Sequence, residues 1–168
     1  MSEALHNEVT ELEADNGMKK AARREVADAL AGNVADTYSL FASTQGLHWN
    51  VQGPLFYSIH KMTEEQYQDM FEAIDDLAER IRTLGFPAPA TLGQMYEHSI
   101  IGEIDPEADV KSQIEQLIGA NEKVTKRMRE AVDKAEALND VKTADLLTER
   151  IGVHEENAWM LRATIAEA

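Results

Sequence analysis

The chain has 168 residues, of which 43% are hydrophobic and 28% charged, a balance typical of one globular domain with a buried core. It contains no Cys, so disulfides, zinc fingers, iron–sulfur clusters and thiol nucleophiles are excluded. The net charge of −15 disfavours nucleic-acid binding, and it suits either solubility or a surface that attracts cations. The polar start and the lack of a long apolar run predict a cytoplasmic protein without a signal peptide or membrane helix.

Residues 1–17 hold five acidic residues and no Lys or Arg, which predicts a mobile acidic tail ahead of a bundle that covers 18–168. A first helix is predicted over 19–51, because apolar residues recur there at steps of three or four until Gly53-Pro54. It opens on four bases, here called the basic cluster: Lys19, Lys20, Arg23 and Arg24.

A second helix is predicted over 57–84, where the same apolar spacing runs until Gly85 and Pro87. The connection that follows, over 85–105, spans up to ~66 Å when extended, more than the ~42 Å of a 28-residue helix. It is therefore predicted to cross the whole bundle, with one short helix near 92–99. A single long crossover leaves the second and third long helices parallel, which is the ferritin-like topology.

The third long helix is predicted to open at Asp105-Pro106-Glu107, an N-cap followed by Pro at the first helical position. Its apolar stripe runs from Ile114 to Ala135, and Asn139-Asp140 separates it from a fourth helix. No segment favours a strand, so the predicted fold class is an all-α four-helix bundle.

Five residues are candidates for metal chemistry because imidazoles with carboxylates suit iron or manganese, and also zinc. They are His48, His60, Glu64, Asp75 and Glu79. His48 extends the inward stripe of the first helix, and the other four form two pairs four residues apart on the second helix. Taken singly, His48 is also compatible with a hydrogen-bonded core residue, and the Asp75–Glu79 pair with a solvated face.

The spacing of these residues limits where a metal site can form. The Glu-x-x-His motif of intra-bundle di-iron sites occurs only at Glu3–His6, in the tail, so that kind of site is absent. His60 and Asp75 are 15 residues apart, or ~22 Å along one helix, whereas a ligand lies ~2 Å from its metal. If the two residues share a site, a second subunit must supply one half of it.

Two runs carry a family resemblance over about residues 20–166. The first is His48-Trp49-Asn50-Val51-Gln52-Gly53-Pro54-Leu55-Phe56 with His60 twelve residues after His48, and the second is Asp75-Asp76-Leu77-Ala78-Glu79-Arg80. Together they resemble the signature of the Dps family. The ending His154-Glu155-Glu156-Asn157-Ala158-Trp159-Met160-Leu161-Arg162 is similar to the last helix of that family.

The resemblance implies a hollow shell of twelve identical subunits with ferroxidase sites at two-fold interfaces. One subunit would supply His48 and His60, and the other Asp75 and Glu79, for at most two iron ions per site. Glu64 stands where the family often has Asp, and it would bind the second iron. The implied function is oxidation of Fe(II), typically by hydrogen peroxide, and storage of the ferric mineral inside the shell.

The resemblance also assigns four positions outside this ligand set. Trp49 is implied to take up stray oxidising equivalents near the iron, although a Trp that fills an interface explains it as well. Asp140, Asp145 and Glu149 match the acids that line the three-fold iron pores of the family. Acids that favour the N-terminal dipole of a helix are the alternative for these three residues.

Two rival functions remain open. Part of the Dps family compacts DNA through mobile Lys/Arg-rich tails, but here the tail is acidic, so DNA binding is not expected. A ferritin-like shell that binds zinc or manganese without turnover is the other alternative. Peroxide-dependent Fe(II) oxidation separates these possibilities.

Overall fold

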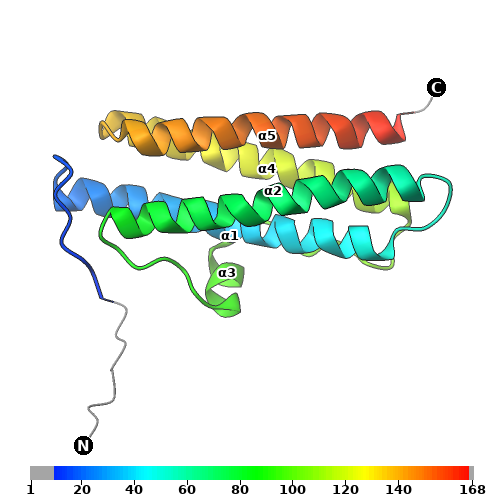
Figure 1. The fold of residues 1–168 in the computed structure, drawn as a ribbon, viewed down its shortest axis with the longest axis horizontal. Helices are drawn as coiled ribbons and strands as arrows, with labels where there is room; N and C mark the ends of the chain where they lie inside the picture. Colours follow the sequence, from blue (N-terminus) through cyan, green and yellow to red (C-terminus); the bar gives the residue numbers. More distant parts are fainter. Residues whose placement is uncertain (1–9, 167–168) are drawn as a thin grey trace, which may run out of the picture.

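The computed structural model describes residues 10–166, which form a bundle of four long helices and one short helix (Figure 1). The elements are α1 (Lys20–Asn50), α2 (Phe56–Thr83), α3 (Leu92–His98), α4 (Val110–Ala137) and α5 (Val141–Ile165). Within this described range there is no strand, and no helix is long and apolar enough to span a membrane. The predicted all-α four-helix bundle is confirmed. The acidic tail was predicted over residues 1–17; residues 1–9 lie outside the described range, residues 10–17 hold no helix, and the mobility of the tail stays a prediction.

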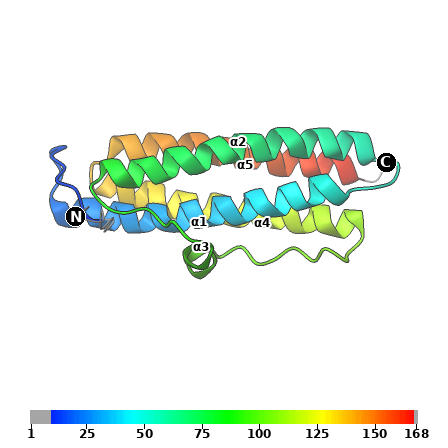
Figure 2. The ribbon, with the colours of Figure 1, turned by 60° about the horizontal axis from the view of Figure 1, so that its bottom comes forward.

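The long crossover is clear in the view of Figure 2, where the chain between α2 and α4 runs the length of the bundle and carries α3 midway. α1 and α2 are antiparallel and pack mainly on each other, and α4 and α5 do the same. The crossover makes α4 parallel to α2, which is the predicted ferritin-like connection. The stripe of α4 from Ile114 to Ala135 faces the core and is buried.

Two of the helix ends use the same capping geometry. After α2, Gly85 has a φ of 97°, its N–H donates to Arg82 O, and the N–H of Phe86 donates to Ile81 O. This pattern of two bonds around a left-handed residue is a Schellman motif. After α4, Asn139 takes the left-handed position with a φ of 59°. Asn tolerates this conformation better than other non-glycine residues, so the chain turns there within a few residues.

The predicted start of the third long helix at Asp105 was wrong. α4 begins at Val110, and the N-cap is Asp109, whose carboxylate accepts from the N–H of Ser112 at 3.0 Å. Asp105 instead accepts from the N–H of Glu107 in a local turn. Both Asp residues offer a capping oxygen, so the local sequence alone does not decide between them.

A buried carboxylate joins the crossover to the bundle. Asp36 is fully buried on α1, and its Oδ1 accepts from Ser99 Oγ at 3.0 Å and from the N–H of Ile100 at 2.8 Å. Its Oδ2 accepts from Arg127 of α4 at 3.0 Å. Gly32 leaves room for this guanidinium, because an added Cβ would lie 2.1 Å from Arg127 Nη2. Asp36 therefore ties three segments together.

Candidate metal centre

His48 and His60 lie against each other where the end of α1 meets the start of α2. Their imidazole rings are stacked, with centroids 3.9 Å apart and planes inclined by 16°. His48 Nδ1 is 2.8 Å from the backbone oxygen of His60, and His60 Nδ1 is 3.0 Å from the backbone oxygen of His48. The turn between the helices thus brings together the two predicted histidine ligands.

These reciprocal bonds determine which nitrogen of each ring carries the proton. A carbonyl oxygen only accepts hydrogen bonds, so each Nδ1 must be the donor. The lone pair of each neutral ring is then on Nε2, which is the atom available to a metal ion. The carbonyl of His48 lies in the last turn of α1, where carbonyls lack an intrahelical donor. A second ring nitrogen bonded to a carbonyl is the usual arrangement for a metal-binding His.

Two further aromatic rings contact the histidine pair. Phe56 stacks on His60 with ring centroids 5.1 Å apart, and Tyr67 meets His48 edge-on at 5.1 Å. Sequence reasoning missed both residues, although each shares a face of α2 with His60. Trp49 follows His48 directly, and its side chain is 68% exposed.

Glu64 lies one turn after His60, but a lysine engages its carboxylate. Lys61 Nζ is 2.7 Å from Glu64 Oε2, and both side chains are partly exposed. The hydrogen bond from Lys61 and its positive charge lower the pKa of the Glu64 carboxyl. Such a pair contributes little to stability, but it places a cation beside the predicted second iron position. The spacing of three residues between the opposite charges is the signal that sequence reasoning overlooked.

Asp75 and Glu79 lie toward the other end of α2, and both are exposed. Asp75 borders a shallow surface groove together with Phe71, whose ring is 66% exposed. The rise of an α-helix separates Asp75 from His60 by about 22 Å. Within residues 10–166, no three His, Asp or Glu side chains lie close enough together to hold a metal ion. A single chain thus gathers the histidines but leaves the carboxylates apart from them.

The three acids predicted to line a pore differ in their surroundings. Asp140 is buried, caps α5 by accepting from the N–H of Thr143 at 3.1 Å, and pairs with Arg80 at 2.7 Å. Burial raises the pKa of the Asp140 carboxyl, but hydrogen bonds from the Thr143 hydroxyl and from Arg80 outweigh it, so the pKa is lowered. Asp145 and Glu149 are exposed. The pore role of all three residues stays a prediction, and in the isolated chain Asp140 joins α2 to α5.

His154 also lies on the apolar stripe of a helix, α5, and it is a core residue. Its side chain is fully buried, and Nδ1 donates to Asn121 Oδ1 at 2.9 Å. The amide of Asn121 is oriented by donation from its Nδ2 to Leu117 O. Burial, and secondly the charge of Arg150, lower the pKa of His154 to about 3. His154 is therefore neutral at physiological pH.

Acidification should weaken the fold through His154. Below its ordinary pKa of 6.5 the unfolded chain binds a proton there, whereas the folded chain does not until about pH 3. This group therefore leaves the free energy of unfolding unchanged above pH 6.5. Between pH 6.5 and about pH 3 it lowers the free energy of unfolding by about 1.4 kcal/mol per pH unit. Denaturant unfolding at pH 7 and pH 5, at one protein concentration, measures this loss. The drop in the free energy of unfolding between the two pH values should be smaller in His154→Gln. The control His98→Gln, at an exposed site, should show the same drop as the parent protein. Equal drops in the parent protein and both variants would contradict the role of His154.

Comparison with known proteins identifies the family. A ferritin-like domain model matches residues 27–168. The chain is 32% identical over 143 residues to DNA protection during starvation protein 2 of Bacillus anthracis. The aligned region covers 83% of this chain and 96% of that protein. The chain belongs to the Dps family of ferritin-like proteins.

Solved Dps structures share the fold over almost the whole chain. The Dps protein of Vibrio cholerae, described as a member of a broad superfamily of ferritin-like diiron-carboxylate proteins, has a TM-score of 0.86 and 28% identity. The match covers 92% of this chain and 98% of that one. An archaeal Dps homologue from Halobacterium salinarum has a TM-score of 0.88 and 25% identity, covering 99% and 93% of the two chains.

Proposed function

We propose that this Dps-family chain oxidises Fe(II) with hydrogen peroxide at sites shared between two subunits, and stores the ferric product inside a hollow shell of twelve subunits. The observation that carries the proposal is the order of residues along one face of α2. His60, Glu64, Asp75 and Glu79 all lie on this face, with the histidine end and the carboxylate end about 22 Å apart. An antiparallel pairing of two copies places each histidine end beside the carboxylate end of its partner.

The ligand chemistry supports Fe(II) as the substrate. His48 and His60 would each offer the lone pair of Nε2, and Asp75 and Glu79 of a second copy would add two carboxylates. This mixture of imidazole and carboxylate suits Fe(II), and the two negative charges balance the ion. Because Lys61 already holds Glu64, a second iron at each site would have to displace that ion pair. We therefore assign one strong and one weak iron position per site.

The surface between the two half-sites supports the pairing. Phe71 lies on α2 between the histidine and carboxylate ends, and its ring is 66% exposed. Aromatic side chains such as Phe are enriched in the surfaces that protein chains bury against one another. Trp49, which is similarly exposed beside His48, lies at the other end of the same proposed interface.

Anaerobic loading with Fe(II) followed by peroxide tests the proposed reaction. One peroxide takes two electrons, so the balanced reaction is 2 Fe²⁺ + H₂O₂ + 2 H⁺ → 2 Fe³⁺ + 2 H₂O. We expect the absorbance of ferric iron to saturate at one peroxide added per two Fe(II). Iron or zinc that binds without any peroxide-dependent oxidation would instead support the shell that lacks turnover.

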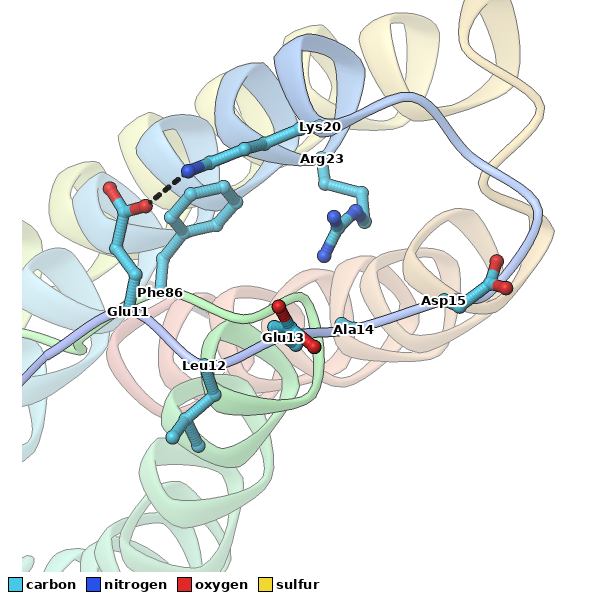
Figure 3. A pocket seen from close by; sticks show the side chains of 8 residues that line it. All are labelled: Glu11, Leu12, Glu13, Ala14, Asp15, Lys20, Arg23 and Phe86. Carbon is cyan, nitrogen blue, oxygen red and sulfur yellow. Dashed lines mark ion pairs between the residues drawn. The ribbon is translucent and has the colours of Figure 1, made fainter.

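The alternative of a DNA-compacting protein is disfavoured by the contacts of the basic cluster. Glu11 pairs with Lys20 at 2.6 Å, as Figure 3 shows, and also with Arg24. Arg23 is buried and donates to Leu84 O at 2.9 Å. Among the residues described, only Lys19 of the cluster lacks such a contact. Few side chains of the basic cluster therefore remain available to neutralise DNA phosphates and displace their counterions.

We expect no retardation of plasmid DNA by the intact protein at neutral pH and about 0.1 M salt. Glu11→Gln should permit weak, salt-sensitive binding, because it frees Lys20 and Arg24. Glu13→Gln is the matched control, since it removes the same charge from a side chain without an ion pair in the structure. Tight binding by the intact protein would restore the DNA-compacting alternative. Equal binding by both variants would show that net charge, and not the Glu11 contact, is decisive.

A further inference from the structure

A continuous series of aromatic rings joins the two half-sites within one chain. From the stacked histidine pair, His48 contacts Tyr67 with ring centroids 5.1 Å apart. Tyr67 contacts Phe41 of α1 at 6.2 Å, and Phe41 contacts Phe71 at 6.1 Å. The proposed function leaves the two inner rings of this series, Tyr67 and Phe41, without a role.

The series ends beside the carboxylates. Phe71 and Asp75 are four residues apart on α2 and border the same surface groove. Glu79 follows one turn later on the same face. The rings thus begin at the ligands of one proposed iron site and end at the ligands of the next. A single subunit contributes its histidines to the first of these sites and its carboxylates to the second.

We propose that this series is an electron relay between the two iron sites of a subunit pair, with Tyr67 as its oxidisable station. The inference rests on the proposed function, and it adds a route by which two separate sites act on one peroxide. Tyr67 carries the phenol on the direct path between the two half-sites, and a phenol loses an electron far more readily than the ring of Phe. Tyr38 also contacts Phe41, with ring centroids 6.0 Å apart, as a side branch of that path. Phe41 and Phe71 fill the remaining distance with packed ring atoms.

The need for a relay follows from electron counting. Peroxide requires two electrons, and each Fe(II) supplies one. Because Lys61 engages Glu64, a site at low iron holds a single Fe(II) in its strong position. The second electron must then come from the neighbouring site, about 22 Å away along α2. Direct tunnelling falls steeply over such a distance, and an intermediate station divides it into shorter steps.

The relay balances in two steps. In the first, peroxide accepts one electron from the Fe(II) beside it and one from Tyr67. Its O–O bond breaks, and the phenol proton and one proton from solvent complete two waters: H₂O₂ + Fe²⁺ + TyrOH + H⁺ → Fe³⁺ + TyrO• + 2 H₂O. In the second, the Fe(II) of the neighbouring site reduces the phenoxyl radical, which regains a proton from solvent: TyrO• + Fe²⁺ + H⁺ → TyrOH + Fe³⁺. The sum is the reaction proposed above.

The test uses the full-length assembled protein, loaded anaerobically with one Fe(II) per site and mixed with half an equivalent of peroxide. Tyr67→Phe keeps the ring and removes the phenol. Tyr57→Phe is the matched control, because Tyr57 is 72% exposed at the start of α2 and lies outside the series. Freeze-quench electron paramagnetic resonance detects the radical, and ring-deuterated tyrosine identifies it by narrowing the signal. Spin trapping measures hydroxyl radical released when the second electron does not arrive.

We expect a transient tyrosyl signal in the parent protein and in Tyr57→Phe. In Tyr67→Phe the signal should be lost, ferric iron should form slower by about an order of magnitude, and hydroxyl radical should rise. Co(II) titration should give the same affinity in all three proteins. An unchanged signal and rate in Tyr67→Phe, or a rate loss explained by weaker Co(II) binding, would overturn the relay. No Fe(II) oxidation in the parent protein would overturn the proposed function itself.

Discussion

Replacing Asp75 with Asn and Glu79 with Gln together should slow peroxide-driven Fe(II) oxidation by about two orders of magnitude or more. The new side chains have the same shape but lose the two negative charges that would balance Fe(II) at the proposed shared site. Both positions are exposed, so the fold should be retained. Stopped-flow absorbance of ferric iron at limiting Fe(II) measures the initial rate.

The control for this pair lies on the same helix. Glu72→Gln with Asp76→Asn removes the same charge from exposed residues that are also four apart. Its rate should stay near that of the parent protein, and light scattering should give about twelve subunit masses for all three proteins. An unchanged rate in the Asp75/Glu79 variant would remove these residues from the site. A monodisperse monomer of the parent protein would refute both the shared site and the shell.

Asp36→Ala should lower the free energy of unfolding by about 3–5 kcal/mol, the usual cost of removing one partner from a buried ion pair. Ser99 Oγ and the N–H of Ile100 would lose their acceptor, and the Arg127 guanidinium would lose its carboxylate partner while keeping the backbone oxygen of His98 as an acceptor. The side chain of Arg127 is 27% exposed and can recover some hydration, which favours the lower end of this range. Denaturant unfolding at a fixed protein concentration measures the change, because assembly affects apparent stability.

An exposed ion pair supplies the comparison. Glu122→Ala removes the partner of Arg162 at the surface, where both side chains are about half exposed, so the expected cost is about 0–1 kcal/mol. A similar small effect for Asp36→Ala would show that the crossover does not depend on this carboxylate. A large effect would show that the contacts of Asp36 with the crossover and α4 stabilise the fold.

The helices were predictable from sequence because their bonds are local. Each α-helical hydrogen bond joins residues four apart, so apolar spacing and Gly or Pro punctuation predict where a helix runs and ends. The predicted limits of α1 and α2 are off by one residue at each end. The start of α4 was missed by four residues, since Asp105 and Asp109 are locally equivalent caps and only packing selects one.

Part of the candidate site was likewise predictable from the sequence, and part depends on the tertiary structure. The sequence alone places the histidines and carboxylates about 22 Å apart on one helix, because the rise of a helix is constant. It therefore determines that no single copy completes the proposed site. The reciprocal bonds that orient His48 and His60 depend instead on how the turn between α1 and α2 folds back.

Only the tertiary structure decided the contacts between distant segments. Asp36 meets Ile100 and Arg127 across separations of 64 and 91 residues, and the ring series alternates between α1 and α2. Glu11 reaches back to the basic cluster from a segment without helical periodicity. Such contacts depend on how whole helices pack, so a local pattern of residue types does not predict which distant side chains will be in contact.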